Sequence, residues 1–138
     1  MRVLVDTNIC LDAALRRQPF ASDAIEILSR SEMGELHAFL SAHSFDTLFY
    51  ILSKSWNHEV AYTALSGLRK AVNIAPVTQK IIDSALHLKW KDFEDGIHHE
   101  CAIEVDCNVI ITRNTSDFTQ SSLPVMEPDE FLSAYCRS

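Results

Sequence analysis

Short apolar, β-branched runs alternate with helical patterns along the whole chain, and this alternation constrains the fold most. The two clearest runs are residues 2–5 and 108–112, and polar residues follow each of them directly. A continuous apolar run of this length is typical of a strand buried on both faces of a parallel sheet. Strands that alternate with helices predict helices on both faces of that sheet. We therefore expect a three-layer α/β/α fold with a central, mostly parallel sheet of four to five strands.

The remaining elements are expected from apolar spacing and from capping and breaking residues. Further strands are predicted at 36–41, at 72–77 and near 124–126. The connections are short and no linker or repeat interrupts them, so residues 1–138 are expected to form a single domain. The intervals predicted to be helical are 9–15, 20–33, 45–52, 59–71, 79–86, 93–105 and 129–135.

Composition narrows the class of protein. The chain is 47% hydrophobic and 22% charged, as in soluble globular proteins. Its N-terminus lacks a signal-peptide pattern and no apolar run approaches the roughly 18–20 residues of a membrane span, so a cytoplasmic protein is expected. The four cysteines lack zinc-finger spacing, which favours reduced, buried thiols. The three glycines lie too far apart to form a phosphate-cradling loop, which excludes nucleotide-binding classes that need one.

The net charge of −7 argues against a broadly basic nucleic-acid-binding surface. It does not exclude nucleic acid, because metal-dependent nucleases gather acidic residues at the active site and bound cations reverse the local sign.

Acidic residues occur where strands end and where helices begin. Asp6 follows the first strand, and Asp92 and Asp95 open the helix predicted at 93–105. Residues three apart project from the same side of a helix. Neighbouring carboxylates repel unless a proton or a cation lies between them. This stretch is therefore the first indication of a metal site.

Two further acids are expected at the same edge of the sheet. Asp117 and Asn114 follow the strand at 108–112, and Asp46 is predicted in the first turn of the helix at 45–52. The carboxyl ends of neighbouring parallel strands meet at one edge, where ligands bind in open α/β sheets. Oxygen ligands without histidine or thiolate suit Mg²⁺ or Mn²⁺ and disfavour zinc. A carboxylate cluster that holds one or two such cations is suited to phosphodiester cleavage.

Polar neighbours are expected to orient ligands and water around such a cluster. They are Thr7, Asn8, Thr112 and Asn114. Arg113 is expected either to contact phosphate or to remain a solvated charge in an exposed loop.

Several of these residues also have a structural interpretation. Asp6 would then only cap the following helix, and Asp46 would only gain from the helix dipole. His98 and His99 point about 100° apart on a helix and cannot easily share an ion, so both are expected on a surface or partly buried helix. Trp56 and Trp90 are candidates for stacking on bases, but packing in the core or at an interface is commoner.

Four motifs occur in order along the chain: LVDTN (4–8), SFDTL (44–48), DFEDG (92–96) and ITRNTSDF (111–118). Together they resemble the PIN-domain ribonucleases that act as VapC-type toxins of toxin–antitoxin modules. The resemblance implies an endoribonuclease dependent on Mg²⁺ or Mn²⁺, with RNA as substrate, a possible cognate antitoxin and a homodimer. It also implies that apolar helices such as those at 45–52 and 59–68 supply a dimer face or an antitoxin groove.

The resemblance also implies site residues. Asp6, an acid near residue 46 and Asp95 would be the metal ligands, and Asp92 with residues 112–117 would complete the catalytic site. Two positions differ from the family pattern. The second acid is more often glutamate, and either Asp46 or Thr47 occupies its position. The last acid often lies two residues after the threonine, where this chain has Asn114, so that Asp117 either replaces it or caps a turn.

Two rival functions remain. A catalytically inactive PIN-like module that binds RNA or protein is favoured by the acidic net charge and by Asn114. The retained Asp6, Asp92 and Asp95 oppose it, because unneutralised carboxylates are costly to keep together. A phosphatase with a covalent aspartate would need a second acid two residues later, where this chain has Asn8.

Overall fold

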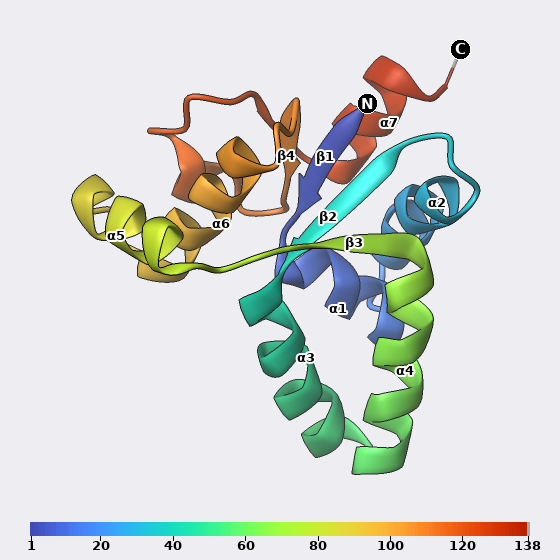
Figure 1. Cartoon of the computed structure of the whole chain (residues 1–138). Coiled ribbons are helices and arrows are strands. Elements are labelled where there is room, and N and C mark those ends of the chain that lie inside the picture. Colours follow the sequence, from blue (N-terminus) through green and yellow to red (C-terminus); the bar gives the residue numbers. More distant parts are fainter. Residues whose placement is uncertain (138) are drawn as a thin grey trace.

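The computed structural model describes residues 1–137 and has a five-stranded, fully parallel sheet at its centre (Figure 1). The strand order is β3-β2-β1-β4-β5, so the first strand of the chain lies in the middle. Leu4 is in register with Phe39 on one side and with Ile110 on the other. The predicted α/β class and parallel sheet are confirmed. The strands are β1 (Arg2–Val5), β2 (His37–Ser41), β3 (Val72–Ala75), β4 (Val109–Ile111) and β5 (Val125–Met126).

Helices cover both faces of the sheet. In Figure 1, α5 and α6 lie on one side, and α1, α2 and α7 lie on the other, where α3 and α4 extend away from the sheet. The helices are α1 (Thr7–Leu15), α2 (Ala21–Glu32), α3 (Ala42–Ser55), α4 (His58–Ala71), α5 (Gln79–Leu88), α6 (Phe93–Glu104) and α7 (Pro128–Tyr135), with a 3-10 turn η1 (Thr115–Phe118).

The core is divided by the sheet because successive side chains of a strand point to opposite faces. In β1, Val3 and Val5 pack with the apolar residues of α1, α2 and α7. Leu4 between them packs with α5, α6 and Phe118 of η1. Val3, Leu4 and Val5 are each at most 1% exposed. This burial holds the carboxyl end of β1 rigidly in the middle of the sheet.

Helix α3 begins at Ala42, three residues before the predicted start. Ser41 caps it, and its Oγ accepts the backbone N–H of Ser44 at 3.3 Å. As a result Asp46 lies beyond the first turn and is exposed, so the predicted first-turn position of Asp46 is wrong.

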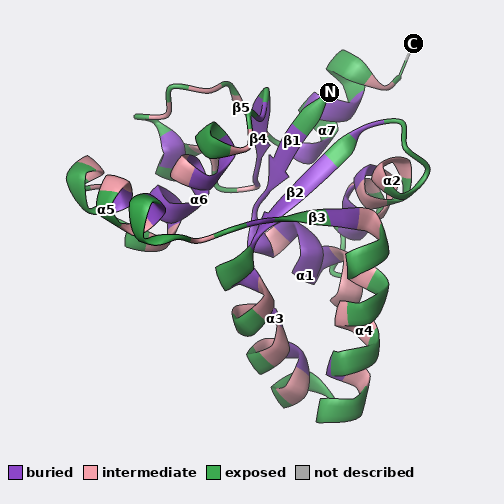
Figure 2. Cartoon of the chain, in the orientation of Figure 1, coloured by how far each residue is buried: buried purple, intermediate pink, exposed green. Residues whose placement is uncertain are grey.

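The α3–α4 pair is amphipathic. Leu48 and Leu52 are buried, whereas Tyr50 and Trp56 are 59% and 49% exposed. Figure 2 shows the outer parts of both helices as exposed or half-buried. The expectation of a buried helix at 45–52 therefore holds for one side of α3 only.

The cysteines match the expectation of free thiols. Cys10, Cys101 and Cys107 are buried and Cys136 is half-buried. Burial raises the pKa of Cys10 to about 12, which leaves this thiol protonated and unreactive. None of the helices within residues 1–137 is both long and apolar enough to cross a membrane.

Candidate metal centre

Asp6 occupies the junction between β1 and α1. It stands at the N-cap position of α1, but its side chain makes no capping hydrogen bond. Instead, its Oδ2 accepts the hydroxyl of Thr112 at 2.7 Å, across the carboxyl ends of β1 and β4. The side chain is therefore turned towards the sheet edge and away from the helix that it precedes.

Thr112 fixes the position of the Asp6 carboxylate. It is completely buried at the end of β4, and its Oγ1 also accepts the backbone N–H of Asn114 at 3.0 Å. The Thr112 hydroxyl thus accepts from Asn114 and donates to Asp6, and these two bonds together fix its orientation. The Asn114 side chain is exposed, so this residue contributes through its backbone.

Asp95 enters from the first turn of α6. Asp92 caps this helix, and its Oδ1 accepts the backbone N–H of Asp95 at 3.2 Å. Asp95 itself is only 9% exposed. Burial, and then the negative charges of four neighbours, raise the pKa of the Asp95 carboxyl to about 7. These neighbours are Asp92, Asp6, Asp117 and Glu94. The structure thus brings four of the five predicted acids into one electrostatic cluster.

Asp46 is the fifth predicted acid, and it does not join this cluster. Its side chain faces solvent from the second turn of α3. The buried residue that α3 contributes at this edge is Ser44. Its Oγ lies 2.8 Å from Thr7 Oγ1 and 3.3 Å from His98 Nε2. Thr47, the other candidate for the second acid, is half-buried.

His98 is the residue that the sequence interpretation missed. It was expected on a surface or partly buried helix, but it is 1% exposed, and its Nδ1 lies 3.5 Å from Oδ1 of Asp6. Burial lowers the pKa of His98, and the nearby Asp6 opposes that shift. His98 follows Asp95 by three residues, so both project from one side of α6. This spacing was the available signal.

Asp6, Asp95 and His98 together fit a divalent cation. Each offers one ligand atom, and these atoms all lie within 4.8 Å of one another. His98 Nδ1 is buried and has no hydrogen-bond partner among the described residues, so this nitrogen is free to bind a metal ion inside the cluster. Two carboxylates and a neutral ring nitrogen are ligands that divalent metals accept.

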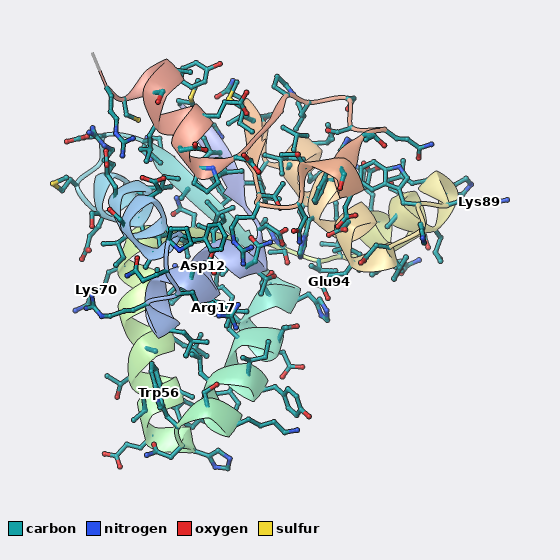
Figure 3. The ribbon with its side chains drawn as sticks, turned by 180° about the vertical axis from the view of Figure 1, so that it is seen from behind. Asp12, Arg17, Trp56, Lys70, Lys89 and Glu94 are labelled. Atoms are coloured by element: carbon teal, nitrogen blue, oxygen red, sulfur yellow. The ribbon has the colours of Figure 1, made fainter. Side chains whose placement is uncertain are left out.

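Arg113 has a partner of its own. Its Nε and Nη2 lie 2.5 Å and 3.1 Å from the carboxylate of Asp12, which is completely buried in α1. Its guanidinium also lies 4.1 Å from the ring centre of Phe20. Figure 3 shows Asp12 and Arg17 close together on this side of the molecule. Arg113 therefore forms an ion pair with Asp12. The sequence predicts a phosphate contact or a solvated charge instead.

Asn8 lies in the first turn of α1, and its Oδ1 is buried without a hydrogen-bond partner among residues 1–137. The side chain is thus close in sequence to Asp6 but is not bonded to it. Its predicted part in orienting ligands stays a prediction.

A polar groove of about 560 Å³ adjoins the acids. It is bounded by the loop before α6 and by η1, with both positive and negative side chains on its walls. Its lining includes Lys89, Trp90, Lys91, Asp92, Ser116 and Asp117. Trp90 also packs edge-on against the buried Phe118, which is the commoner of its two predicted roles.

The sequence profile of the PIN domain matches residues 2–116. This match covers most of the chain, and the chain belongs to the PIN-domain family. A search of curated protein sequences gives no significant match.

Solved structures of toxin–antitoxin proteins share the fold. A toxin–antitoxin complex from Klebsiella pneumoniae has 25% identity and a TM-score of 0.68, over 91% of this chain and 97% of that one. VapBC-1 from Haemophilus influenzae has 18% identity and a TM-score of 0.70, over 94% and 99%. VapC20 from Mycobacterium tuberculosis, described as a toxin that cleaves the sarcin–ricin loop, has 14% identity and a TM-score of 0.67, over 85% and 95%.

Proposed function

We propose that this protein is a metal-dependent endoribonuclease and the toxin of a toxin–antitoxin module. The observation that carries the proposal is the convergence of Asp6 and Asp95 from separate elements, with Asp92 and Asp117 close enough to raise the pKa of Asp95. Buried carboxylates repel one another unless a cation neutralises them. The PIN-domain match and the VapC20 likeness add support for RNA as the substrate.

The residues have separate parts in this proposal. Asp6 and Asp95 hold the cation, and Thr112 orients the Asp6 carboxylate through its 2.7 Å hydrogen bond. Mg²⁺ or Mn²⁺ held by these residues would supply Lewis-acid chemistry, which makes hydroxide available near neutral pH and offsets negative charge on the phosphate. Asp92 fixes the start of α6 and Asp117 adds negative charge at the open side.

The polar groove would hold the RNA strand beside the acids. Lys89 and Lys91 are exposed on its wall, close in sequence to Asp92. We infer that their positive charges contact phosphates of the RNA and partly offset the negative cluster.

The partners follow from the family and from the free apolar surface. The solved structures that share its fold include toxin–antitoxin complexes. An apolar groove of about 290 Å³ lies between α1, α2, α3 and α4, lined by residues such as Leu28, Leu48 and Leu65. We infer that an antitoxin segment or a second copy of the chain covers this region, and that the protein acts in the cytoplasm.

Cleavage assays with matched variants test the proposal. Wild-type protein with Mn²⁺ is expected to cleave a pool of structured and single-stranded RNA. Asp6→Asn and Asp95→Asn should lose at least about a hundredfold in rate, because each removes a group that holds the cation. Asp83→Asn, which changes an exposed acid on α5, is the control and should cleave normally. Folded wild-type protein that neither cleaves RNA nor binds Mn²⁺ would instead indicate an inactive binding module.

A further inference from the structure

A ring nitrogen and a carboxylate oxygen face each other inside the cluster. His98 Nδ1 and Asp6 Oδ1 are 3.5 Å apart, and both side chains are more than nine-tenths buried. The other oxygen of Asp6 already accepts the Thr112 hydroxyl, whereas Nδ1 has no hydrogen-bond partner among the described residues. A buried polar atom without a partner is costly, so something with positive charge is expected between these two atoms.

The opposite ring nitrogen of His98 indicates which atom carries the proton. Nε2 lies 3.3 Å from Ser44 Oγ and 3.9 Å from Oε1 of Glu94. The Ser44 oxygen is within hydrogen-bond distance, and the Ser44 hydroxyl can still donate its own proton to Thr7 Oγ1, whereas Glu94 is too distant for a hydrogen bond. A proton on Nε2 therefore has an acceptor in Ser44. Nδ1 then presents a lone pair to the carboxylate of Asp6, which can only accept.

The spacing of the atoms suits ligands of one ion. Metal–oxygen and metal–nitrogen bonds of about 2.0–2.2 Å place neighbouring ligand atoms roughly 3 to 3.6 Å apart. The separation of 3.5 Å between Asp6 and His98 falls in this range. Asp95 and His98 are three residues apart on α6, the same helical spacing by which carboxylate and histidine bind metal in helical di-iron proteins.

We propose that His98 Nδ1 binds the same cation as Asp6 and Asp95, and that this nitrogen makes the site prefer a first-row transition metal such as Mn²⁺ over Mg²⁺. The proposal rests on the proposed function in requiring a divalent cation between Asp6 and Asp95. The preference follows from ligand chemistry, because imidazole binds transition-metal ions well whereas Mg²⁺ favours oxygen. Ser44 would then orient the ring from the other side, as partners of metal-binding histidines do.

His99 is a matched control on the same helix. It is 4% exposed, but its ring is fully engaged, with Nδ1 at 2.8 Å from Glu100 and Nε2 accepting the backbone N–H of Ser122 at 3.2 Å. It is not part of the Asp6–Asp95–His98 group. His43 is a second control, since it lies 3.3 Å from Glu94 at the edge of the cluster. Figure 3 labels Glu94 near the start of α3.

Pulsed EPR of Mn²⁺-loaded protein gives a readout that does not depend on activity. Wild-type protein should show nitrogen-14 coupling to the Mn²⁺ electron spin. His98→Gln should lose the coupling, whereas His99→Gln and His43→Gln should keep it. By calorimetry, His98→Gln should weaken Mn²⁺ binding by about tenfold or more. Its affinity for Mg²⁺ should change much less.

Each other result overturns the proposal in a recognisable way. Mn²⁺ that binds wild-type protein without nitrogen coupling makes His98 a structural residue and leaves the nuclease proposal intact. Coupling that persists in His98→Gln but disappears in His43→Gln would show that the metal-bound nitrogen belongs to His43 and not to His98. Wild-type protein that binds no Mn²⁺ at all contradicts both this inference and the proposed function. If His98→Gln does not fold, the spectra of wild-type protein, His99→Gln and His43→Gln decide, because coupling present in all three excludes both control histidines.

Discussion

Two aspartates of this chain are buried in opposite ways. Asp12 is completely buried, and Arg113 neutralises it with two contacts, while Arg17 lies 3.9 Å away. Asp95 is also buried, but its charged neighbours are carboxylates, and burial together with these charges raises its pKa to about 7. One carboxylate is satisfied by the chain itself, and the other is not. A buried charge that the chain does not satisfy indicates where an external cation belongs.

The largest expected effect comes from removing Asp12, the buried aspartate that the chain itself neutralises. Asp12→Ala should lower the free energy of unfolding by about 3 kcal/mol, because Arg113 keeps its partly buried charge without a partner. Urea titration followed by circular dichroism measures this change. Asp23→Ala, which removes a surface partner of Arg137, is the control and should have little effect. Equal losses in the two variants would show that burial of Asp12 is unimportant.

The next effect concerns the hydrogen bond from the Thr112 hydroxyl to the Asp6 carboxylate. Thr112→Val keeps the shape of the side chain but removes the hydroxyl that donates to Asp6. We expect a loss of about 2 kcal/mol, because a buried carboxylate and the Asn114 N–H both lose a partner. Thr112→Ser retains the hydroxyl and should keep most of the stability. A Val variant as stable as the Ser variant would contradict the importance of this bond.

A smaller effect is expected at Asp95, where the substitution should raise stability and not lower it. The pKa of Asp95 is about 7 in the folded metal-free protein and ordinary, near 3.8, when unfolded. The folded state therefore binds this proton more tightly, and stability falls as pH rises from about 4 to about 7. Asp95→Asn should flatten that slope and stabilise the metal-free protein at pH 8 by about 1 kcal/mol, after allowance for solvent at the site.

Thermal unfolding at several pH values measures this effect. Mn²⁺ should stabilise wild-type protein at pH 8 and should have little effect on Asp95→Asn. A destabilised Asp95→Asn variant in metal-free buffer would contradict the repulsion that the neighbouring carboxylates imply.

The smallest effect concerns the lysines that flank the cluster. Lys89→Gln combined with Lys91→Gln should weaken single-stranded RNA binding only moderately. Each lost phosphate contact should reduce the slope of log affinity against log salt by about 0.7. Binding to the cleavage-deficient Asp6→Asn protein provides the measurement, and Lys54→Gln, on α3, is the control. An unchanged slope would place the RNA elsewhere.

The sequence predicted the part of the site that depends on strand order. Asp6 and Thr112 each follow a buried apolar run, and parallel neighbours bring such ends together. The start of α6 was also predictable, because Asp92 is a good capping residue three positions before Asp95. These residues depend on local pattern and on one topological rule.

The rest depended on where α3 begins and on what packs against α6. Ser41 caps α3 three residues earlier than its apolar pattern indicates, so Ser44 lies in the first turn at this edge of the sheet and the exposed Asp46 lies beyond it. The burial of His98 comes from the end of β1 and from Ser44, both distant in sequence. Adjacent His98 and His99 cannot easily share an ion, and the potential metal ligands on α6 are instead Asp95 and His98, three residues apart. Arg113 was also ambiguous, because its partner Asp12 is 101 residues away.

The hydrogen bond between Asp6 and Thr112 joins residues 106 positions apart, and this separation matters while the protein is being made. At about 5–20 residues per second, a ribosome needs roughly 5 to 20 seconds to travel from one to the other. During that time β1 has no β4 beside it, and the Asp6 carboxylate has no hydroxyl to hold it. An unfinished chain therefore carries its acids without an assembled centre. Synthesis stopped before residue 112 should release harmless fragments of the proposed nuclease.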